Sequence, residues 1–294
     1  MTVDIDSKII KKLDKQEKEE GNLPLLWDFY RKLLHIQSKA AKRIGTSRPG
    51  LSSEAINEQI NDGLPLLDFN NLALDLPLLQ EVFVDVVAAF ADYPKLFGEV
   101  PEKLIERKSS RLLTKKAVKA WLQGKTLPAT ILAGSDKENL MQAIIHATLK
   151  PFLANYARAL IKLVDQEQWR RRYCPICGGS PDFSFLDKER GARYLLCSRC
   201  DTAWIFQRLE CPYCGNKDQA NLAYFTNDEG LYRFFVCEQC KNYLKAIDLQ
   251  QSKSEVLLPL ERLYTLDIDS QAQQQGYHPY GKPAAEKAPE DRSA

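Results

Sequence analysis

Apolar residues recur every three or four positions through the first half of the chain, which is the pattern of amphipathic helices. From Pro24 onwards one helical face is apolar, and Pro24 suits a first helical turn because its missing N–H would have no partner there. A second helix is expected to begin near Pro77 and to end before Pro94. A third is expected over residues 112–123, with Gly124 at its end.

A fourth helix is expected after Ser135-Asp136-Lys137-Glu138, which is typical of a capping box. Its apolar pattern continues to Trp169, and Pro151 is expected to kink the helix or to divide it into two. We therefore assign residues 23–168 to one all-helical domain.

The two ends of the chain are more polar. Residues 1–22 alternate charged residues with a few apolar ones, which predicts either a frayed amphipathic helix or a mobile arm, and we assign them to a mobile charged arm. Residues 251–277 are assigned to a C-terminal packing segment, in which 257–267 forms a helix or strand over the preceding strands. Residues 278–294 are rich in Pro, Lys, Glu, Ala and Ser and are expected to be disordered.

Between these regions the apolar pattern changes to short strand-like runs separated by turn-rich loops. The first three runs form one group, a hairpin followed by a further strand. The next two runs form a second hairpin, and a further strand is expected to follow it in the same way. The runs cover residues 183–186, 193–196, 202–209, 222–226 and 231–236. The sequence thus predicts an α+β multidomain protein, with a helical domain followed by two tandem zinc-ribbon or rubredoxin-like β subdomains at 169–209 and 210–250.

All eight cysteines lie in this strand-rich region, in four Cys-x-x-Cys pairs. The pairs are Cys174/Cys177, Cys197/Cys200, Cys211/Cys214 and Cys237/Cys240. Two such pairs can surround one ion with four thiolates, so we expect one metal ion in each repeat, held by the first four and the last four cysteines respectively. An interleaved arrangement is the alternative, and the repeat argues against it.

Four thiolates suit Zn(II) and also iron in the rubredoxin manner, so the sequence predicts two metal ions per chain and leaves iron or zinc open. Disulfides are the competing interpretation, but regular spacing in a chain expected to be cytoplasmic favours metal binding. A closed four-cysteine shell offers no open position for Lewis-acid catalysis. A thioredoxin-type role would need a strand-to-helix setting that these pairs lack.

Composition and charge narrow the possible partners. The chain is 44% hydrophobic and 27% charged with a net charge of +2, which is typical of a globular protein without a polyanionic ligand. Thiolate-bound divalent ions would make the cysteine region slightly negative, so nucleic acid is not expected as a partner. Charged residues interrupt the most apolar stretch, 72–97, so membrane insertion is not expected. Residues 1–22 contain no secretory signal, which favours the cytoplasm.

Catalytic motifs are not apparent. The three histidines, His35, His146 and His278, lie in a charged helix, at the edge of an apolar stripe and in the expected tail. There is no Gly-rich phosphate loop, His-Glu-x-x-His motif or convincing carboxylate pair. The sequence therefore favours a protein that is not an enzyme.

Two stretches of the cysteine region resemble the FdhE family of formate dehydrogenase accessory proteins. They are Gly-Ala-Arg-Tyr-Leu-Leu-Cys-Ser-Arg-Cys-Asp-Thr-Ala-Trp at 191–204 and Cys-Glu-Gln-Cys-Lys-Asn-Tyr-Leu-Lys-Ala-Ile-Asp at 237–248. Leu-Tyr-Thr-Leu-Asp at 263–267 and Gln-Gly-Tyr at 275–277 are similar to the family's ending, so the resemblance covers about residues 60–280. The chain departs from the family's expected Glu and His beside Trp204, where it has Ala203 and Ile205.

The resemblance implies a cytoplasmic, non-enzymatic chaperone that binds the molybdopterin-dependent catalytic subunit of a formate dehydrogenase. It also implies rubredoxin-like sites that carry iron. We hypothesise that residues beside the cysteine pairs lie at the partner surface, although Tyr194 and Trp204 could instead belong to the ribbon core. These residues are Arg193, Tyr194, Trp204, Tyr243 and Lys245. The alternative function is rubredoxin-like electron transfer or redox sensing.

Overall fold

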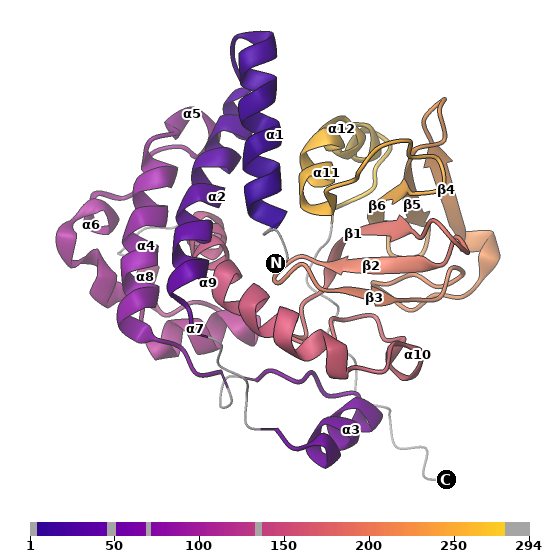
Figure 1. The fold of residues 1–294 in the computed structure, drawn as a ribbon, viewed down its shortest axis with the longest axis horizontal. Coiled ribbons are helices and arrows are strands. Elements are labelled where there is room, and N and C mark those ends of the chain that lie inside the picture. The colour runs from indigo at the N-terminus through magenta and orange to yellow at the C-terminus, as the bar shows by residue number, and fades with distance from the viewer. Residues whose placement is uncertain (1–4, 46–50, 69–71, 133–136, 280–294) are drawn as a thin grey trace. The chain divides into compact units, whose positions relative to one another are not determined.

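The computed structural model describes residues 5–45, 51–68, 72–132 and 137–279. Its contacts divide the chain into two compact units, Met1–Val164 and Asp165–Ala294, which are described separately below. The first unit is helical and the second is built on a β-sheet (Figure 1). This mixed α+β composition agrees with the sequence prediction.

The described part of the first unit consists of helices and short helical turns. The α-helices are α1 (Ile5–Glu20), α2 (Leu25–Arg43), α3 (Ser53–Asp62), α4 (Leu76–Ala91), α5 (Pro94–Phe97), α6 (Glu102–Ile105), α7 (Lys115–Leu122), α8 (Ala129–Leu132) and α9 (Glu138–Leu160), with 3-10 turns at Arg107–Leu112 and Ile161–Leu163. Helix α4 begins as expected around Pro77, where the Asp75 carboxylate accepts a hydrogen bond from the Leu78 amide at 3.0 Å. Aromatic rings fill the space between α2 and the end of α4, with Phe29 and Phe90 centred 4.9 Å apart.

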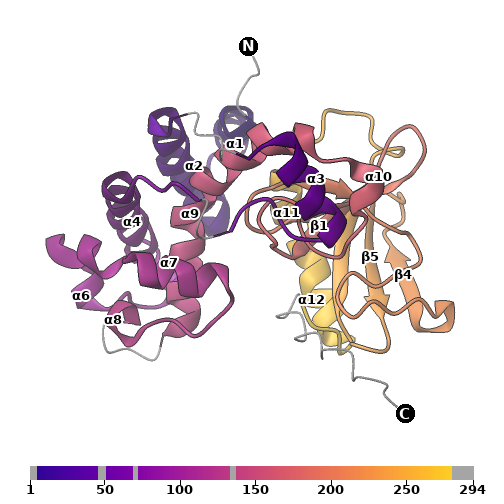
Figure 2. The same cartoon turned by 90° about the horizontal axis from the view of Figure 1, so that it is seen from below.

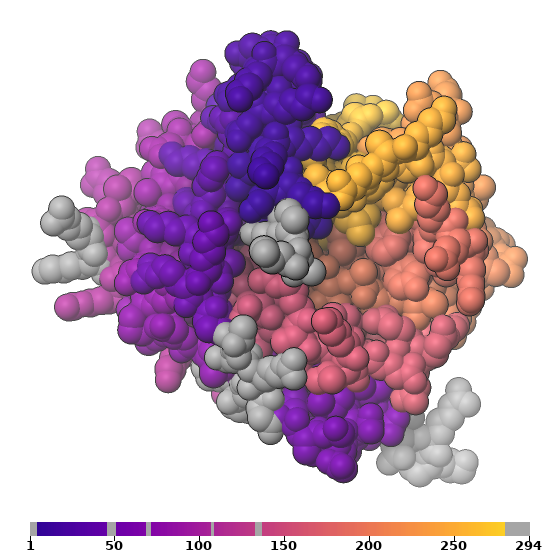
Figure 3. All heavy atoms as spheres, viewed as in Figure 1, coloured from indigo at the N-terminus to yellow at the C-terminus, as the bar shows by residue number. Residues whose placement is uncertain are grey.

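Residues 5–20 form an ordered helix, so the assignment of 1–22 to a mobile arm was wrong for the described residues. Ile9 and Leu13 of α1 are fully buried. Arg31 of α2 reaches back to α1 and pairs with Asp14 at 3.1 Å and with Glu17 at 2.5 Å. The atoms of α1 stand at the surface of the unit, in indigo in Figure 3. The alternating charges therefore mark the solvent face of a packed helix.

Pro151 lies inside α9, which runs from residue 138 to residue 160 as one helix. Of the two alternatives that the sequence left open, division into two helices was therefore wrong. A proline removes the donor that would pair with the carbonyl four residues earlier, here that of Ala147. The buried Gln37 of α2 supplies a replacement, because its side-chain amide donates to the Ala147 carbonyl at 2.8 Å. Ser135 and Asp136 of the expected capping box lie outside the described residues.

The described part of the second unit contains six strands in one sheet and a few short helices. They are α10 (Gln166–Trp169), β1 (Pro181–Leu186), β2 (Arg193–Cys197), β3 (Ala203–Ile205), the 3-10 turn Gln219–Asn221, β4 (Leu222–Thr226), β5 (Tyr232–Cys237), β6 (Tyr243–Asp248), α11 (Leu258–Tyr264) and α12 (Leu266–Gln274). The strand order is β3-β2-β1-β6-β5-β4, and neighbours are antiparallel except for β1 and β6. The two repeats are thus halves of a single sheet joined by a parallel pair, in which Phe183 lies opposite Lys245.

The C-terminal packing segment forms two helices that cover part of this sheet (Figure 2). Ile268 and Ala272 of α12 pack with Phe234 of β5 and Tyr243 of β6 in one apolar cluster. A second cluster contains Phe183, Leu196 and Ile247, at the join between the two halves. The apolar positions that alternate along the strands are therefore buried by the last described part of the chain. Among the helices of the described residues, none is both long and apolar enough to span a membrane.

Candidate metal centres

The eight cysteines converge into two groups of four, each from one sequence repeat. The first group, called centre 1 here, is Cys174, Cys177, Cys197 and Cys200, and the second, centre 2, is Cys211, Cys214, Cys237 and Cys240. Within each group the ligand atoms all lie within 4.8 Å of one another. The grouping within repeats is the one that the sequence favoured over the interleaved alternative.

The sulfur separations fit a tetrahedral metal ion. In centre 1 the Cys174–Cys200 and Cys177–Cys197 sulfurs are 3.6 and 3.5 Å apart, and in centre 2 the Cys211–Cys240 and Cys214–Cys237 sulfurs are 3.7 and 3.6 Å apart. A disulfide would require about 2.05 Å. Two sulfurs bound at about 2.3 Å to a tetrahedral ion lie about 3.8 Å apart. Each group could therefore hold one ion, with all four positions filled by sulfur.

Each Cys-x-x-Cys pair forms the same turn, which we call a knuckle. In all four knuckles the amide of the first cysteine donates to the carbonyl five residues later, and the amide four residues later donates back to that cysteine's carbonyl. The residue after the second cysteine has a positive φ in every case, namely Gly178 at 66°, Asp201 at 56°, Gly215 at 75° and Lys241 at 55°. Only two of these residues are glycine, so Asp201 and Lys241 adopt a conformation that most side chains disfavour.

Backbone amides also point at the sulfur atoms. The Ile176 amide lies 3.4 Å from the Cys174 sulfur, and the Arg199 amide lies 3.4 Å from the Cys197 sulfur. In centre 2 the side-chain amide of Asn216 approaches the Cys237 sulfur at 3.9 Å. Such N–H groups stabilise thiolates and influence the properties of the metal that they hold.

Centre 1 also depends on a glycine that the sequence analysis did not single out. A Cβ added to Gly179 would lie 2.9 Å from the Cys197 sulfur and 2.9 Å from the Arg199 side chain. The equivalent position in centre 2 is Asn216, whose side chain instead turns towards Cys237. In centre 1 the backbone at residue 179 therefore lies too close to the Cys197 sulfur for any side chain to fit between them.

The two centres differ in burial. All four cysteines of centre 1 are buried, whereas Cys214 and Cys240 of centre 2 are partly exposed. Burial raises the pKa of the Cys174 and Cys200 thiols well above the ordinary value, because a lone thiolate is poorly solvated there. Burial also raises the pKa of Cys214, to about 11. A cation is thus needed to keep four thiolates together in such a site.

Four of the five residues that the sequence placed at a partner surface are buried. The exposed fractions of Arg193, Trp204, Tyr243 and Lys245 are 3%, 0%, 3% and 7%, and Tyr194 is partly buried. Tyr194 stacks on Phe185 of the neighbouring strand, with ring centres 5.0 Å apart. For Tyr194 and Trp204 these positions favour the ribbon-core alternative. Arg193, Tyr243 and Lys245 are also too buried in this conformation to meet a partner directly.

Tyr243 and Lys245 instead attach the C-terminal helices to the sheet. The Tyr243 hydroxyl donates to one oxygen of Asp269 at 2.7 Å, and the Lys245 ammonium donates to the other at 2.5 Å. Lys245 also donates to the carbonyl of Thr265 at 3.2 Å. Burial, together with the hydrogen bond to the Asp269 carboxylate, raises the pKa of Tyr243, so its hydroxyl stays protonated and able to donate.

Arg262 of α11 forms a second attachment, which reaches centre 1. Its guanidinium donates to Asp201 at 2.8 Å, to Asp182 at 2.7 Å and to the Cys197 carbonyl at 3.1 Å. The pair with Asp201 offers a reason for a non-glycine residue at that strained position. Sequence reasoning missed this contact because 61 residues separate the two side chains.

The histidines do not join either centre. His35 is exposed, His146 stacks on Trp121 with ring centres 5.8 Å apart, and His278 pairs with Asn242 in an isolated bridge. His146 thus contributes to packing, as the sequence suggested.

Comparisons with known proteins agree with this geometry. Residues 173–208 match the family model described as the central domain of FdhE. The FdhE homolog of Aquifex aeolicus is 26% identical over 268 residues, which cover 90% of this chain and 88% of that protein. The FdhE homolog of Haemophilus ducreyi is 32% identical over 136 residues, 45% of this chain and 44% of that protein.

A solved structure supports the fold over nearly the whole chain. The crystal structure of the FdhE protein from Pseudomonas aeruginosa covers 93% of this chain, and 91% of that chain is covered in return. The TM-score is 0.58 at 22% identity, so this comparison concerns the fold. The central-domain match and the relatives confirm the resemblance of this chain to FdhE proteins that the sequence indicated.

Proposed function

We propose that the chain is a non-enzymatic accessory protein that assists the maturation of a formate dehydrogenase in the cytoplasm, by binding its molybdopterin-dependent catalytic subunit. The observation that carries the proposal is similarity to an FdhE homolog over 90% of the chain. The cysteine geometry is compatible with a binding role, because a four-sulfur shell leaves no open position for a substrate.

The surface that we propose for the client is the outer edge of β4. This strand ends the sheet, and Tyr224 and Phe225 are 54% and 41% exposed. The opposite edge is different, because Gln166 of α10 accepts a hydrogen bond from the Ile205 amide of β3. Within the described residues β4 is an edge strand with exposed aromatic residues, and such a strand is suited to binding an extended segment of another protein by strand addition.

We expect replacement of both Tyr224 and Phe225 by Thr to reduce capture of a formate dehydrogenase catalytic subunit at least about tenfold, since hot spots are rich in aromatic residues. Threonine keeps the strand propensity, and a thermal melt checks the fold because both rings also pack against β5. Leu163→Ser is a matched control, since Leu163 is 44% exposed on the helical unit. Undiminished capture by the double variant contradicts the β4 surface, whereas absence of capture by the unaltered protein contradicts the proposed function.

Rubredoxin-like electron transfer remains the second candidate, and two observations favour it. Amides point at the cysteine sulfurs, and Cys214 and Cys240 of centre 2 are partly exposed to solvent. We expect anaerobically purified protein to contain about two metal ions per chain. Iron with thiolate absorption bands that bleach reversibly on reduction supports electron transfer. Two colourless zinc ions contradict it and leave client binding as the function, and less than one ion of either kind contradicts metal binding itself.

A further inference from the structure

The feature that the proposed function does not use is the buried guanidinium of Arg193. Arg193 begins β2 and is 3% exposed. Its Nη1 donates to the carbonyls of Arg208 and Glu210, at 3.5 and 3.3 Å. Its Nε and Nη2 atoms have no hydrogen-bond partner among the described residues. A buried cation with unpaired donors is costly, so its environment suggests a missing partner.

The two unpaired nitrogens define the shape of that partner. In a guanidinium, Nε–H and Nη2–H lie on the same edge and point in the same direction. This edge is the one that binds both oxygens of a carboxylate side by side. The Nη1 group already donates to two main-chain carbonyls. The edge formed by Nε and Nη2 is therefore left with both of its donors available.

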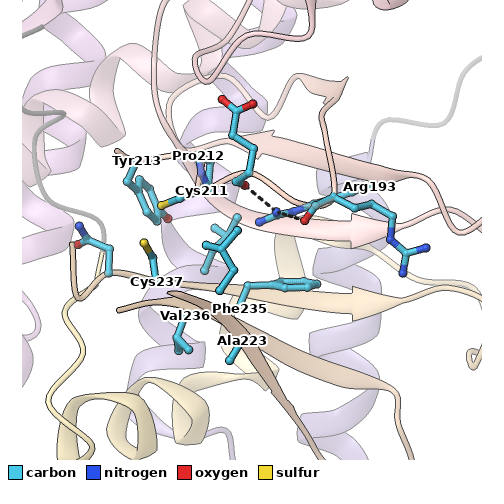
Figure 4. A pocket seen from close by; sticks show the side chains of 13 residues that line it. Arg193, Cys211, Pro212, Tyr213, Ala223, Phe235, Val236 and Cys237 are labelled. Atoms are coloured by element: carbon cyan, nitrogen blue, oxygen red, sulfur yellow. Dashed lines mark hydrogen bonds between the residues drawn. The ribbon is translucent and has the colours of Figure 1, made fainter. Parts of the chain in front are cut away.

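The guanidinium lines a pocket between the two halves of the sheet (Figure 4). The pocket contains about 310 Å³ of space between atoms, part of which is open to solvent, so it would take only a small group. The side chains of Leu222 and Leu244, on the same face of the sheet as Phe235, form apolar walls, whereas Val236 and Ala223 point away from the guanidinium. Phe235 lies beneath the guanidinium, with 4.5 Å from the guanidinium carbon to the ring centre. An aromatic ring on one face and carbonyls at one edge fix the orientation of the cation.

The negative groups in the pocket wall do not accept hydrogen bonds from the Nε and Nη2 atoms of Arg193. The carboxylate of Glu210 lies 3.4 Å from the Lys217 ammonium. Cys211 and Cys237 also line the pocket, and their sulfurs belong to centre 2. Burial lowers the pKa of Arg193 to about 10, with attraction to Tyr213 and Cys211 opposing the change. Arg193 therefore remains charged at neutral pH.

We propose that this pocket binds a carboxylate, held by the Nε and Nη2 edge of Arg193 over the Phe235 ring. The carboxylate comes either from a small free acid or from the C-terminus of a peptide. The ligand would lie next to centre 2, so its binding would respond to the state of that centre. This inference is independent of the client proposed above.

The test measures the melting temperature of the metal-loaded full chain against acetate concentration, with chloride replacing acetate to hold ionic strength constant. We expect a saturable rise for the unaltered protein and an affinity at least about tenfold lower for Arg193→Met, since that variant removes a paired charge-assisted contact. Arg190→Met is the matched control, because Arg190 is exposed in the β1–β2 turn and loses the same charge. Its acetate response should be unchanged.

A second variant keeps the test valid if Arg193→Met does not fold. Leu222→Phe narrows the pocket from strand β4 without removing the guanidinium, because Leu222 lies on the same face of the sheet as Phe235, and it should also weaken the acetate response. Short peptides with a free or an amidated C-terminus separate the two sources: stabilisation by the free form alone identifies a chain end, and acetate binding without peptide binding identifies a small acid. No saturable response to acetate or peptide, or an equal response in Arg193→Met or in Leu222→Phe, overturns the proposal and leaves the thiolates of centre 2 as the counter-charge of Arg193.

Discussion

Replacing Cys177 with Ser is expected to abolish cooperative folding of the sheet unit, whereas Cys214→Ser is expected to leave the unit folded. Both variants remove one thiolate from a four-sulfur shell. Cys177 is buried with the three other cysteines of centre 1. The serine hydroxyl is a weaker metal ligand than a thiolate, and water cannot reach the ion to take its place. Cys214 is partly exposed, and a water molecule can take the vacant position in centre 2.

The size of the first effect follows from the role of the metal. A structural zinc site contributes about 10–16 kcal/mol to folding, as much as or more than the roughly 5–15 kcal/mol by which a whole domain is stable. Centre 1 is also tied to the rest of the unit by Arg262, which binds the Cys197 carbonyl. Centre 2 lies beside the exposed strand β4, whose Leu222 is opposite Cys237 at the edge of the sheet.

The measurement is metal content per chain together with thermal unfolding followed by circular dichroism. Cys214→Ser should retain the ion of centre 1 and a cooperative transition, and Cys177→Ser should lose the transition of the sheet unit. Loss of the transition in both variants would mean that the two centres are equally structural. Retention in both would mean that the fold does not depend on either ion.

The sequence predicted those parts of the structure that depend on local pattern. The cysteine spacing identified both four-sulfur groups, and strand periodicity placed β4 at residues 222–226, as found. Proline and apolar spacing located α4. These features are set by neighbours along the chain, so a single sequence contains the necessary information.

The parallel pairing of β1 with β6, which turns two repeats into one sheet, was not predicted. Nothing in either strand alone specifies a partner 62 residues away, as Phe183 and Lys245 are. Burial of charged residues was missed for the same reason. Lys245 resembles a surface residue until Asp269, 24 positions later, is brought beside it by the fold of α12.

The contact between Lys245 and Asp269 leads to a second prediction, a large loss of stability in Asp269→Ala. This variant removes the carboxylate that Lys245 and Tyr243 share. Lys245 is 7% exposed, so its ammonium would stay buried without an opposing charge. Breaking a buried ion pair from one side typically costs 3–5 kcal/mol. The Asp269 side chain is 26% exposed, which admits some water, so we expect a loss at the lower end, about 3 kcal/mol.

Thermal and denaturant unfolding of the metal-loaded protein measure this loss, and Asp267→Ala is the matched control because Asp267 is exposed on the same helix. Proteolysis should also become faster in α12, whose attachment to β6 depends on Asp269. A double variant, Lys245→Met with Asp269→Leu, should recover much of the stability, since apolar residues can replace a buried pair. Equal stability of Asp269→Ala and Asp267→Ala would show that the carbonyls of Thr265 and Arg262 alone satisfy the Lys245 ammonium.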